Sequence, residues 1–286
     1  MEFSAPHIHA HQDTHIHTHT AILLHGRGSN GPEFAEELFS SMTSRNKNLA
    51  ACLPNWRWVF PTSRDRWTTV FQEEMPAWFD AYSLTNIQDR QDLQVDGLRE
   101  SVLHILEILE TEIRLLDGKA SHVYLGGISQ GMAVALWTVF CARDRINQQL
   151  GGILGFCGWL PFANQAEDLI RQSKGTDTHH GVPDRYRLQR LISDLFLNTV
   201  GIAEASQTVD AVDKVSPIFS TPVLLGHGID DAYVPVELGQ QALRILREVM
   251  DRVEGKEFSG AEGEGHLIKE PEGFDHILDF LEAGSL

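Results

Sequence analysis

Residues 123–137, VYLGGISQGMAVALW, constrain the fold more than any other part of the chain. An apolar run leads into Gly127-Ile128-Ser129-Gln130-Gly131, which fits G-x-S-x-G, and an apolar segment of helical character follows. Glycines lack a Cβ, so a strand and a helix can approach closely on either side of a sharp turn. The pattern therefore predicts a strand, a turn with an exposed Ser129 hydroxyl at its tip, and a helix. The alternative is a buried glycine-rich turn with an inert serine.

Short apolar runs alternate with helical patterns along the rest of the chain. The expected strands are Thr18–Leu24, Trp58–Phe60, His122–Leu125, Gly152–Phe156, Pro222–Gly226 and Glu257–Ser259. The expected helices are Glu33–Met42, Asp92–Leu116, Gln130–Ala142, Arg185–Asn198, Glu237–Val253 and Gly273–Leu281. This alternation predicts one α/β domain over residues 1–286, with an insertion at about 165–216. We expect a doubly wound, mainly parallel sheet with helices on both faces and functional loops at the carboxyl ends of its strands.

Composition excludes several classes of partner. The formal net charge of -17 disfavours nucleic acid and anionic membrane surfaces. Three cysteines without C-x-x-C spacing argue against a disulfide framework and a thiolate zinc site. No stretch approaches the roughly 18 uninterrupted apolar residues of a spanning helix, and the first residues lack the pattern of a secretory signal. We therefore expect a cytoplasmic protein without stable membrane insertion. Its oligomeric state does not follow from the sequence.

A serine nucleophile needs a general base and an orienting carboxylate downstream. Asp230 and Asp231 follow the Pro222–Gly226 strand, and His266 lies in a glycine-rich loop before the last helix, so the order Ser, Asp, His is present. The helix that begins near Gln130 aims its first N–H groups at the place where an oxyanion would form. The Gln130 amide is thus one expected oxyanion donor.

At this point the chain resembles the acyl-protein thioesterase/lysophospholipase-like carboxylesterases, a branch of the α/β-hydrolase fold. The segments that carry the resemblance are LLHGRGSNG (Leu23–Gly31), EMPAWFD (Glu74–Asp80), LGGISQGMA (Leu125–Ala133), GFCGWLP (Gly155–Pro161), GHGIDDAYVP (Gly226–Pro235) and GEGH (Gly263–His266). The resemblance implies cleavage of carboxylic esters or thioesters of small molecules or acylated proteins, with no metal or organic cofactor. It implies Ser129 as nucleophile, His266 as base and Asp231 rather than Asp230 as orienter. It also implies an oxyanion hole from the backbone N–H groups of Arg27 and Gln130.

Three departures from the family pattern concern substrate choice. Ile229 stands where the family has a first aspartate, Ala232 where it has proline, and Arg27 where it often has leucine. We expect the Arg27 side chain to be solvated, with attraction of a substrate carboxylate as the alternative.

Other residues are candidates for substrate contact. Large aromatic side chains can line an acyl pocket or fill the core, and this choice stays open for Trp67, Trp78 and Trp159. Leu195 and Phe196 belong to an apolar stripe in the Gln172–Asn198 segment. We expect this segment to be a partial lid over the acyl pocket, and the alternative is that the stripe packs permanently on the helical layer.

Six histidines alternate with other residues between His7 and His19. Period-two alternation predicts an edge hairpin that leads into the Thr18–Leu24 strand. A two-residue turn scatters the histidines over both faces, whereas a three-residue turn brings His11 opposite His15 and His9 opposite His17 and could bind a metal adventitiously. Two rival functions therefore remain, a peptidase on the same fold and a non-catalytic metal-binding protein.

Overall fold

The computed structural model describes residues 2–11, 14–174, 184–202 and 216–284. A seven-stranded sheet runs through the molecule in the order β1-β3-β2-β6-β7-β8-β9. Its strands are β1 (His7–His9), β2 (His19–Leu24), β3 (Trp56–Phe60), β6 (Val123–Ile128), β7 (Gly152–Phe156), β8 (Val223–Gly228) and β9 (Val253–Phe258). All neighbouring pairs are parallel except β1 with β3. The predicted α/β-hydrolase architecture is confirmed.

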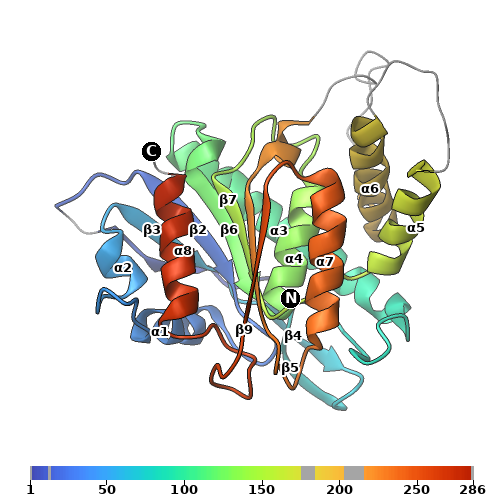
Figure 1. Ribbon diagram of the computed structural model, residues 1–286, viewed down its shortest axis with the longest axis horizontal. Helices are drawn as coiled ribbons and strands as arrows, with labels where there is room; N and C mark the ends of the chain where they lie inside the picture. Colours follow the sequence, from blue (N-terminus) through green and yellow to red (C-terminus); the bar gives the residue numbers. More distant parts are fainter. Residues whose placement is uncertain (1, 12–13, 175–183, 203–215, 285–286) are drawn as a thin grey trace.

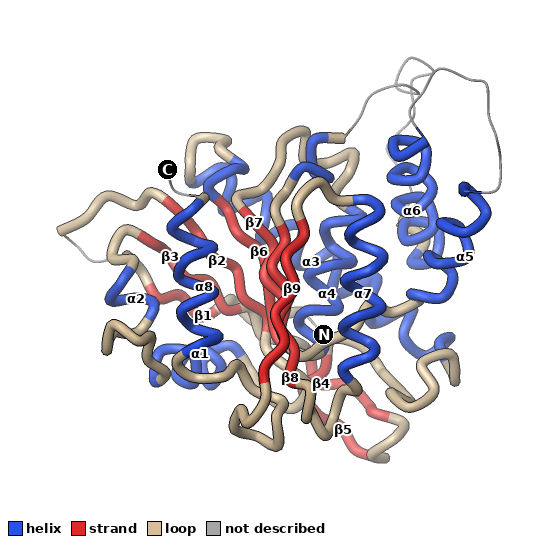
Figure 2. The backbone as a smooth tube through the Cα atoms, in the orientation of Figure 1, coloured by secondary structure: helices blue, strands red, loops and turns tan. Residues whose placement is uncertain are grey.

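Helices cover both faces of this sheet (Figure 1). They are α1 (Gly31–Ser40), α2 (Leu49–Cys52), α3 (Gln94–Leu115), α4 (Gln130–Cys141), α5 (Ala163–Lys174), α6 (Asp184–Val200), α7 (Val236–Val249) and α8 (Glu272–Ala283). Figure 2 shows the strands between α1, α2 and α8 on one side and α3, α4 and α7 on the other. Two apolar clusters fill the two interfaces, which is why the central strands are apolar on both faces.

All twelve residues of α4 are buried. The helix lies between the sheet and two outer helices, α3 and α6. A helix that is apolar all round needs such complete cover. Because α4 directly follows β6, this packing holds the junction between the two elements in one place.

The N-terminal histidine segment does not form the expected hairpin. β1 instead pairs antiparallel with β3, so His7 lies opposite Phe60 and His9 opposite Trp58. This pairing covers the outer edge of β3, which would otherwise expose unpaired backbone groups. Neither predicted hairpin register occurs, and the His11 and His17 rings lie stacked with centroids 5.5 Å apart.

A second, two-stranded sheet was not expected. β4 (Arg64–Thr68) and β5 (Glu73–Ala77) form an antiparallel hairpin after β3. The hairpin projects from the edge of the main sheet at which the parallel strands end (Figure 1). The Gly28 N–H, in the loop after β2, donates to the Pro76 carbonyl at 2.8 Å and ties the hairpin to that edge.

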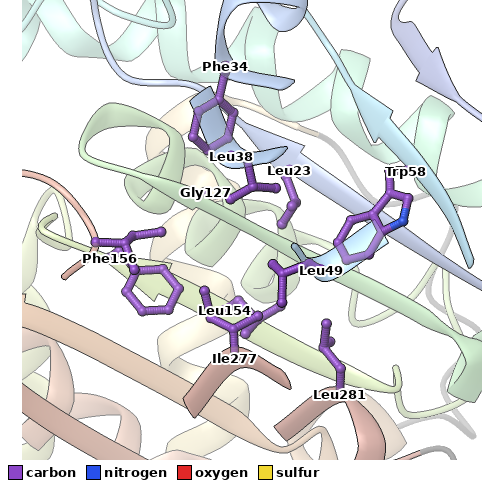
Figure 3. A pocket seen from close by; sticks show the side chains of 11 residues that line it. Leu23, Phe34, Leu38, Leu49, Trp58, Gly127, Leu154, Phe156, Ile277 and Leu281 are labelled. Carbon is purple, nitrogen blue, oxygen red and sulfur yellow. The ribbon is translucent and has the colours of Figure 1, made fainter. Parts of the chain in front are cut away.

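A small apolar cavity lies between the sheet and the helices α1 and α8 (Figure 3). It is lined by Leu23, Phe34, Leu38, Leu49, Trp58, Gly127, Leu154, Phe156, Ile268, Ile277 and Leu281. Its volume of about 20 Å³ is room for about one water molecule. It is therefore a packing gap in the core and cannot hold an acyl chain.

Candidate active site

Ser129 occupies a strained turn between β6 and α4. Its φ of 56° and ψ of -122° lie outside the regions that side-chain-bearing residues favour. The Ser129 N–H donates to the Phe156 carbonyl on the neighbouring strand at 2.9 Å. The side chain, only 9% exposed, thus stands at the carboxyl edge of the sheet in a fixed orientation.

The glycines around Ser129 are needed for close packing. A Cβ at Gly131 would lie 2.2 Å from the Leu24 carbonyl oxygen, and one at Gly127 would lie 2.6 Å from the same oxygen. Because these are backbone atoms of the central strand, they cannot move aside cheaply. The physical reason given for the G-x-S-x-G pattern is therefore confirmed. Gly26 also passes close, since its Cβ would meet the Ser129 Cβ at 3.4 Å.

His266 and Asp231 form a hydrogen-bonded pair. The His266 Nδ1 lies 2.8 Å from Oδ2 and 3.0 Å from Oδ1 of Asp231, whose side chain is fully buried. The backbone N–H groups of Tyr233 and Val234 also donate to Oδ1, at 2.9 and 2.8 Å. Burial raises the pKa of Asp231, but the hydrogen bonds from His227, His266 and the Val234 N–H outweigh it and hold that pKa well below its ordinary value.

Asp230 is exposed and points elsewhere. Its Oδ2 accepts a hydrogen bond from the Gly260 N–H at 2.8 Å. The two adjacent carboxylates therefore have different partners. Asp231 holds the His266 imidazole, and Asp230 holds the loop after β9.

Cys157 connects the serine turn with the histidine loop. It follows Phe156, whose carbonyl holds Ser129, and its Sγ lies 4.0 Å from the Gly265 carbonyl and 3.9 Å from the Leu267 carbonyl. Burial raises the pKa of this thiol to about 12, so it remains protonated. The sequence offered only its count as a cysteine, and its place beside His266 was missed.

Cys157, Asp231 and His266 are also a group of three potential metal ligands. Within the described ranges of the chain, theirs are the only such side chains whose ligand atoms lie within 4.8 Å of one another. A metal prefers the thiolate, which the buried Cys157 does not readily form. The group is better suited to hydrogen bonding than to metal binding, and the N-terminal histidines do not gather into such a group in the described residues.

The two expected oxyanion residues flank Ser129. Gln130 begins α4, and its buried side chain accepts from the Trp78 N–H at 3.1 Å and donates to the Phe79 carbonyl at 3.0 Å. Arg27 is half-buried, its guanidinium lies 4.5 Å from the centre of the Phe71 ring, and it donates to the Ala81 carbonyl at 3.4 Å. The expectation of a solvated Arg27 side chain is therefore wrong.

His25, just before this loop, is a structural residue, as its position at a strand end suggested. Its Nδ1 donates to the Gly26 carbonyl at 2.6 Å, and its Nε2 accepts from the Ser63 N–H at 3.0 Å. Burial lowers its pKa to about 4, so the ring is neutral near pH 7. It braces the loop that carries Arg27.

The aromatic candidates for substrate contact occupy different environments. Trp67 on β4 is 55% exposed, whereas Trp78 and Trp159 are buried. The Trp78 Nε1 donates to the His25 carbonyl at 2.9 Å, and Trp159 packs edge-on against Phe79. Trp78 therefore supports the loops from below rather than offering a free surface to an acyl chain.

The α6 stripe is not brought to this edge of the sheet. Phe196 is fully buried against Trp137 and Phe140 of α4, with ring centroids 4.6 and 4.7 Å apart. These partners lie seven and ten residues after Gln130, roughly 10–15 Å along the helix axis. Leu195 is partly buried against the same core. The residues expected to form a lid thus pack on the helical layer, since a large apolar stripe gains most from permanent burial.

Together these features define a class of protein: an α/β-hydrolase with a serine at a strand–helix turn and a histidine–carboxylate pair in the loops beside it. A family model described as phospholipase/carboxylesterase matches residues 6–185. The chain belongs to the phospholipase/carboxylesterase family, and it is a hydrolase of carboxylic esters or thioesters. The resemblance noted in the sequence is confirmed.

Individual relatives are similar over most of the chain. Acyl-protein thioesterase 1 of Candida albicans is 23% identical over 262 residues, which cover 91% of this chain and 90% of that protein. Probable carboxylesterase SOBER1-like of Arabidopsis thaliana is 28% identical over 266 residues, covering 92% and 76%. The crystal structure of Zea mays acyl-protein thioesterase 2 has a TM-score of 0.64 at 23% identity and covers 98% of both chains, which supports the same fold.

Proposed function

We propose that this chain is a serine carboxylesterase or acyl thioesterase that works through an acyl-Ser129 intermediate. The observation that carries the proposal is the His266 Nδ1, 2.8 Å from the buried Asp231 carboxylate at the edge of the sheet where Ser129 stands. A carboxylate on Nδ1 keeps the proton there and leaves the lone pair of Nε2 free to act as a base.

In the proposed reaction, Ser129 attacks the substrate carbonyl while His266 takes its proton. The negative charge on the tetrahedral oxygen is stabilised by the backbone N–H groups of Arg27 and Gln130, the latter at the positive end of the α4 dipole. His266 then protonates the leaving alcohol or thiol. Water, activated by the same imidazole, releases the acid and restores Ser129. Every proton is carried by His266, so the proposed cycle uses no metal or organic cofactor.

The substrates we propose are small esters or acylated proteins, in keeping with relatives that are named acyl-protein thioesterases and a carboxylesterase. With a net charge of -17, the chain should favour neutral or cationic partners and not nucleic acid. No helix among the described residues is long and apolar enough to cross a membrane. We propose the cytoplasm as its site of action and a single domain as its organisation.

The proposed catalytic unit is tested by comparing neighbouring carboxylates. We expect Ser129→Ala, His266→Ala and Asp231→Asn each to leave a folded protein with kcat lowered by several orders of magnitude, roughly 10³-fold or more. Asp230→Asn is the matched control and should lose far less activity. A larger loss in Asp230→Asn than in Asp231→Asn would contradict the assignment.

The rival functions have distinct readouts. A fluorophosphonate probe labels only an activated serine, so it should label the wild type and not Ser129→Ala. A peptidase would cleave amide substrates at rates comparable to esters, which we do not expect. A metal-dependent protein would lose activity in EDTA and regain it with zinc, whereas the proposed enzyme keeps its kcat after chelation.

A further inference from the structure

A second histidine lies behind the carboxylate of the proposed catalytic unit. His227, in β8, is almost completely buried, and its Nε2 lies 3.3 Å from Oδ2 of Asp231 and 2.9 Å from the Val234 carbonyl oxygen. The sequence analysis did not name His227 among the site residues. The signal in the sequence was its position four residues before Asp231 at the end of a strand.

The contacts of His227 determine which nitrogen carries the proton. A carbonyl oxygen can only accept, so the hydrogen bond to Val234 requires a proton on Nε2. The same N–H also faces Oδ2 of Asp231 and is shared between the two acceptors. The Nδ1 edge of the ring faces α7, where a Cβ on Gly239 would lie only 2.2 Å from Nδ1. The ring is therefore wedged between α7 and the Asp231 loop.

The two oxygens of Asp231 are held from different sides. Oδ1 accepts from the backbone N–H groups of Tyr233 and Val234, within its own loop, and Oδ2 faces the two histidines. His227 is the side chain that approaches this carboxylate from the sheet. Because a carboxylate can rotate about its Cβ–Cγ bond, a fixed donor on Oδ2 restricts the plane in which Asp231 meets His266.

We propose that His227 is a positioning residue that orients the Asp231 carboxylate and withdraws part of its negative charge from His266. The proposal rests on the proposed function, because it assumes that His266 is the base. The donor that His227 offers to Oδ2 competes with His266 for the same charge. Without it, Asp231 would hold the imidazolium form of His266 more strongly, and His266 would keep its proton to a higher pH.

Other charged groups around His227 come from three elements. Glu257 of β9 lies opposite His227 in the sheet register. Arg247 of α7 and Lys256 of β9 line, with His227, Gly239 and Glu257, an open hollow of about 330 Å³. Asp231 is the charged group among these that contacts the ring at Nε2. Substitutions at His227 should therefore act first on Asp231.

The experiment compares His227→Leu with His227→Gln. Leucine removes the donor, and we expect kcat to fall about tenfold, less than the roughly hundredfold loss that a 1 Å misplacement near the reacting groups can cause. KM should change less than twofold, and the acid limb of the kcat/KM profile should move to higher pH. Glutamine carries an amide N–H₂ that can reach the same acceptors, so it should restore most of kcat and the pH profile. The control is His276→Gln on α8, on the other face of the sheet, which should match the wild type.

A second variant reaches the same interaction without removing the histidine. Gly239→Ala would push a methyl group against Nδ1 and displace the ring from Asp231, with the same shift of the acid limb. In the double variant His227→Ala/Gly239→Ala the methyl group has room. We expect it to melt closer to the wild type than Gly239→Ala does while retaining the shifted profile. This pair keeps the proposal testable if His227→Leu fails to fold.

Two results would overturn the proposal. One is a wild-type kcat and pH profile in folded His227→Leu. The other is an equal loss in His227→Leu and His227→Gln with an unmoved acid limb, which would mean that the ring only fills space. The proposed function itself fails separately, if Ser129→Ala keeps its activity or the wild type is not labelled by the fluorophosphonate.

Discussion

Replacing Phe196 with alanine tests whether α6 is part of the core or a lid. The Phe196 ring is 0% exposed and packs against Trp137 and Phe140. Truncating a buried phenylalanine costs about 3–5 kcal/mol, and two aromatic contacts place this residue toward the upper half of that range, about 4 kcal/mol. For a chain of this size, the melting temperature should fall by roughly 6–10 °C.

The assay combines urea unfolding with rates on p-nitrophenyl esters of increasing acyl length. Leu195→Ala is the matched control, because Leu195 is the neighbouring residue and only partly buried, so its unfolding free energy should fall by less. In both variants kcat/KM for acetyl and long-chain esters should change by the same factor, since the stripe does not reach Ser129. Unchanged stability in Phe196→Ala, with a KM that rises only for long acyl chains, would refute the reasoning and restore the lid.

Three further predictions concern the loops around Ser129. Gly131→Ala should lower both stability and the rate of fluorophosphonate labelling, because its Cβ would lie 2.2 Å from the Leu24 carbonyl oxygen; labelling at the wild-type rate would contradict this. His25 has a pKa lowered by burial to about 4, so the unfolded chain binds its proton first as the pH falls below about 6.5, and stability is lost between that pH and about 4. Urea unfolding at pH 7 and pH 5 should differ by about 2 kcal/mol from this group, a part that is absent in His25→Gln. Arg27→Leu should lower kcat/KM for a hemisuccinate ester relative to a butyrate ester by about twofold to fivefold, and equal effects on both esters would exclude an electrostatic contact with the substrate.

The sequence by itself determined the serine turn and most of the sheet. The G-x-S-x-G pattern is a local constraint, because Gly127 and Gly131 must each pass a neighbouring backbone within a few ångströms. The six expected strands and six expected helices correspond to observed elements because their apolar periodicity reflects burial on one or two faces. The residues also provided the order Ser129, Asp231, His266, although only the family resemblance favoured Asp231 over Asp230.

Only the tertiary structure decided which partners these residues meet. β1 pairs with β3 rather than with its neighbour in sequence, because the open edge of β3 lies next to it in space and no local pattern records that edge. The burial of Trp78 and Phe196, and the contact of His227 with Asp231, join segments that are distant in the sequence or lie on different sides of a turn. Periodicity indicates which face of an element is apolar. It does not indicate what covers that face or which of two adjacent carboxylates meets a given histidine, because those outcomes depend on how the loops pack against the finished sheet.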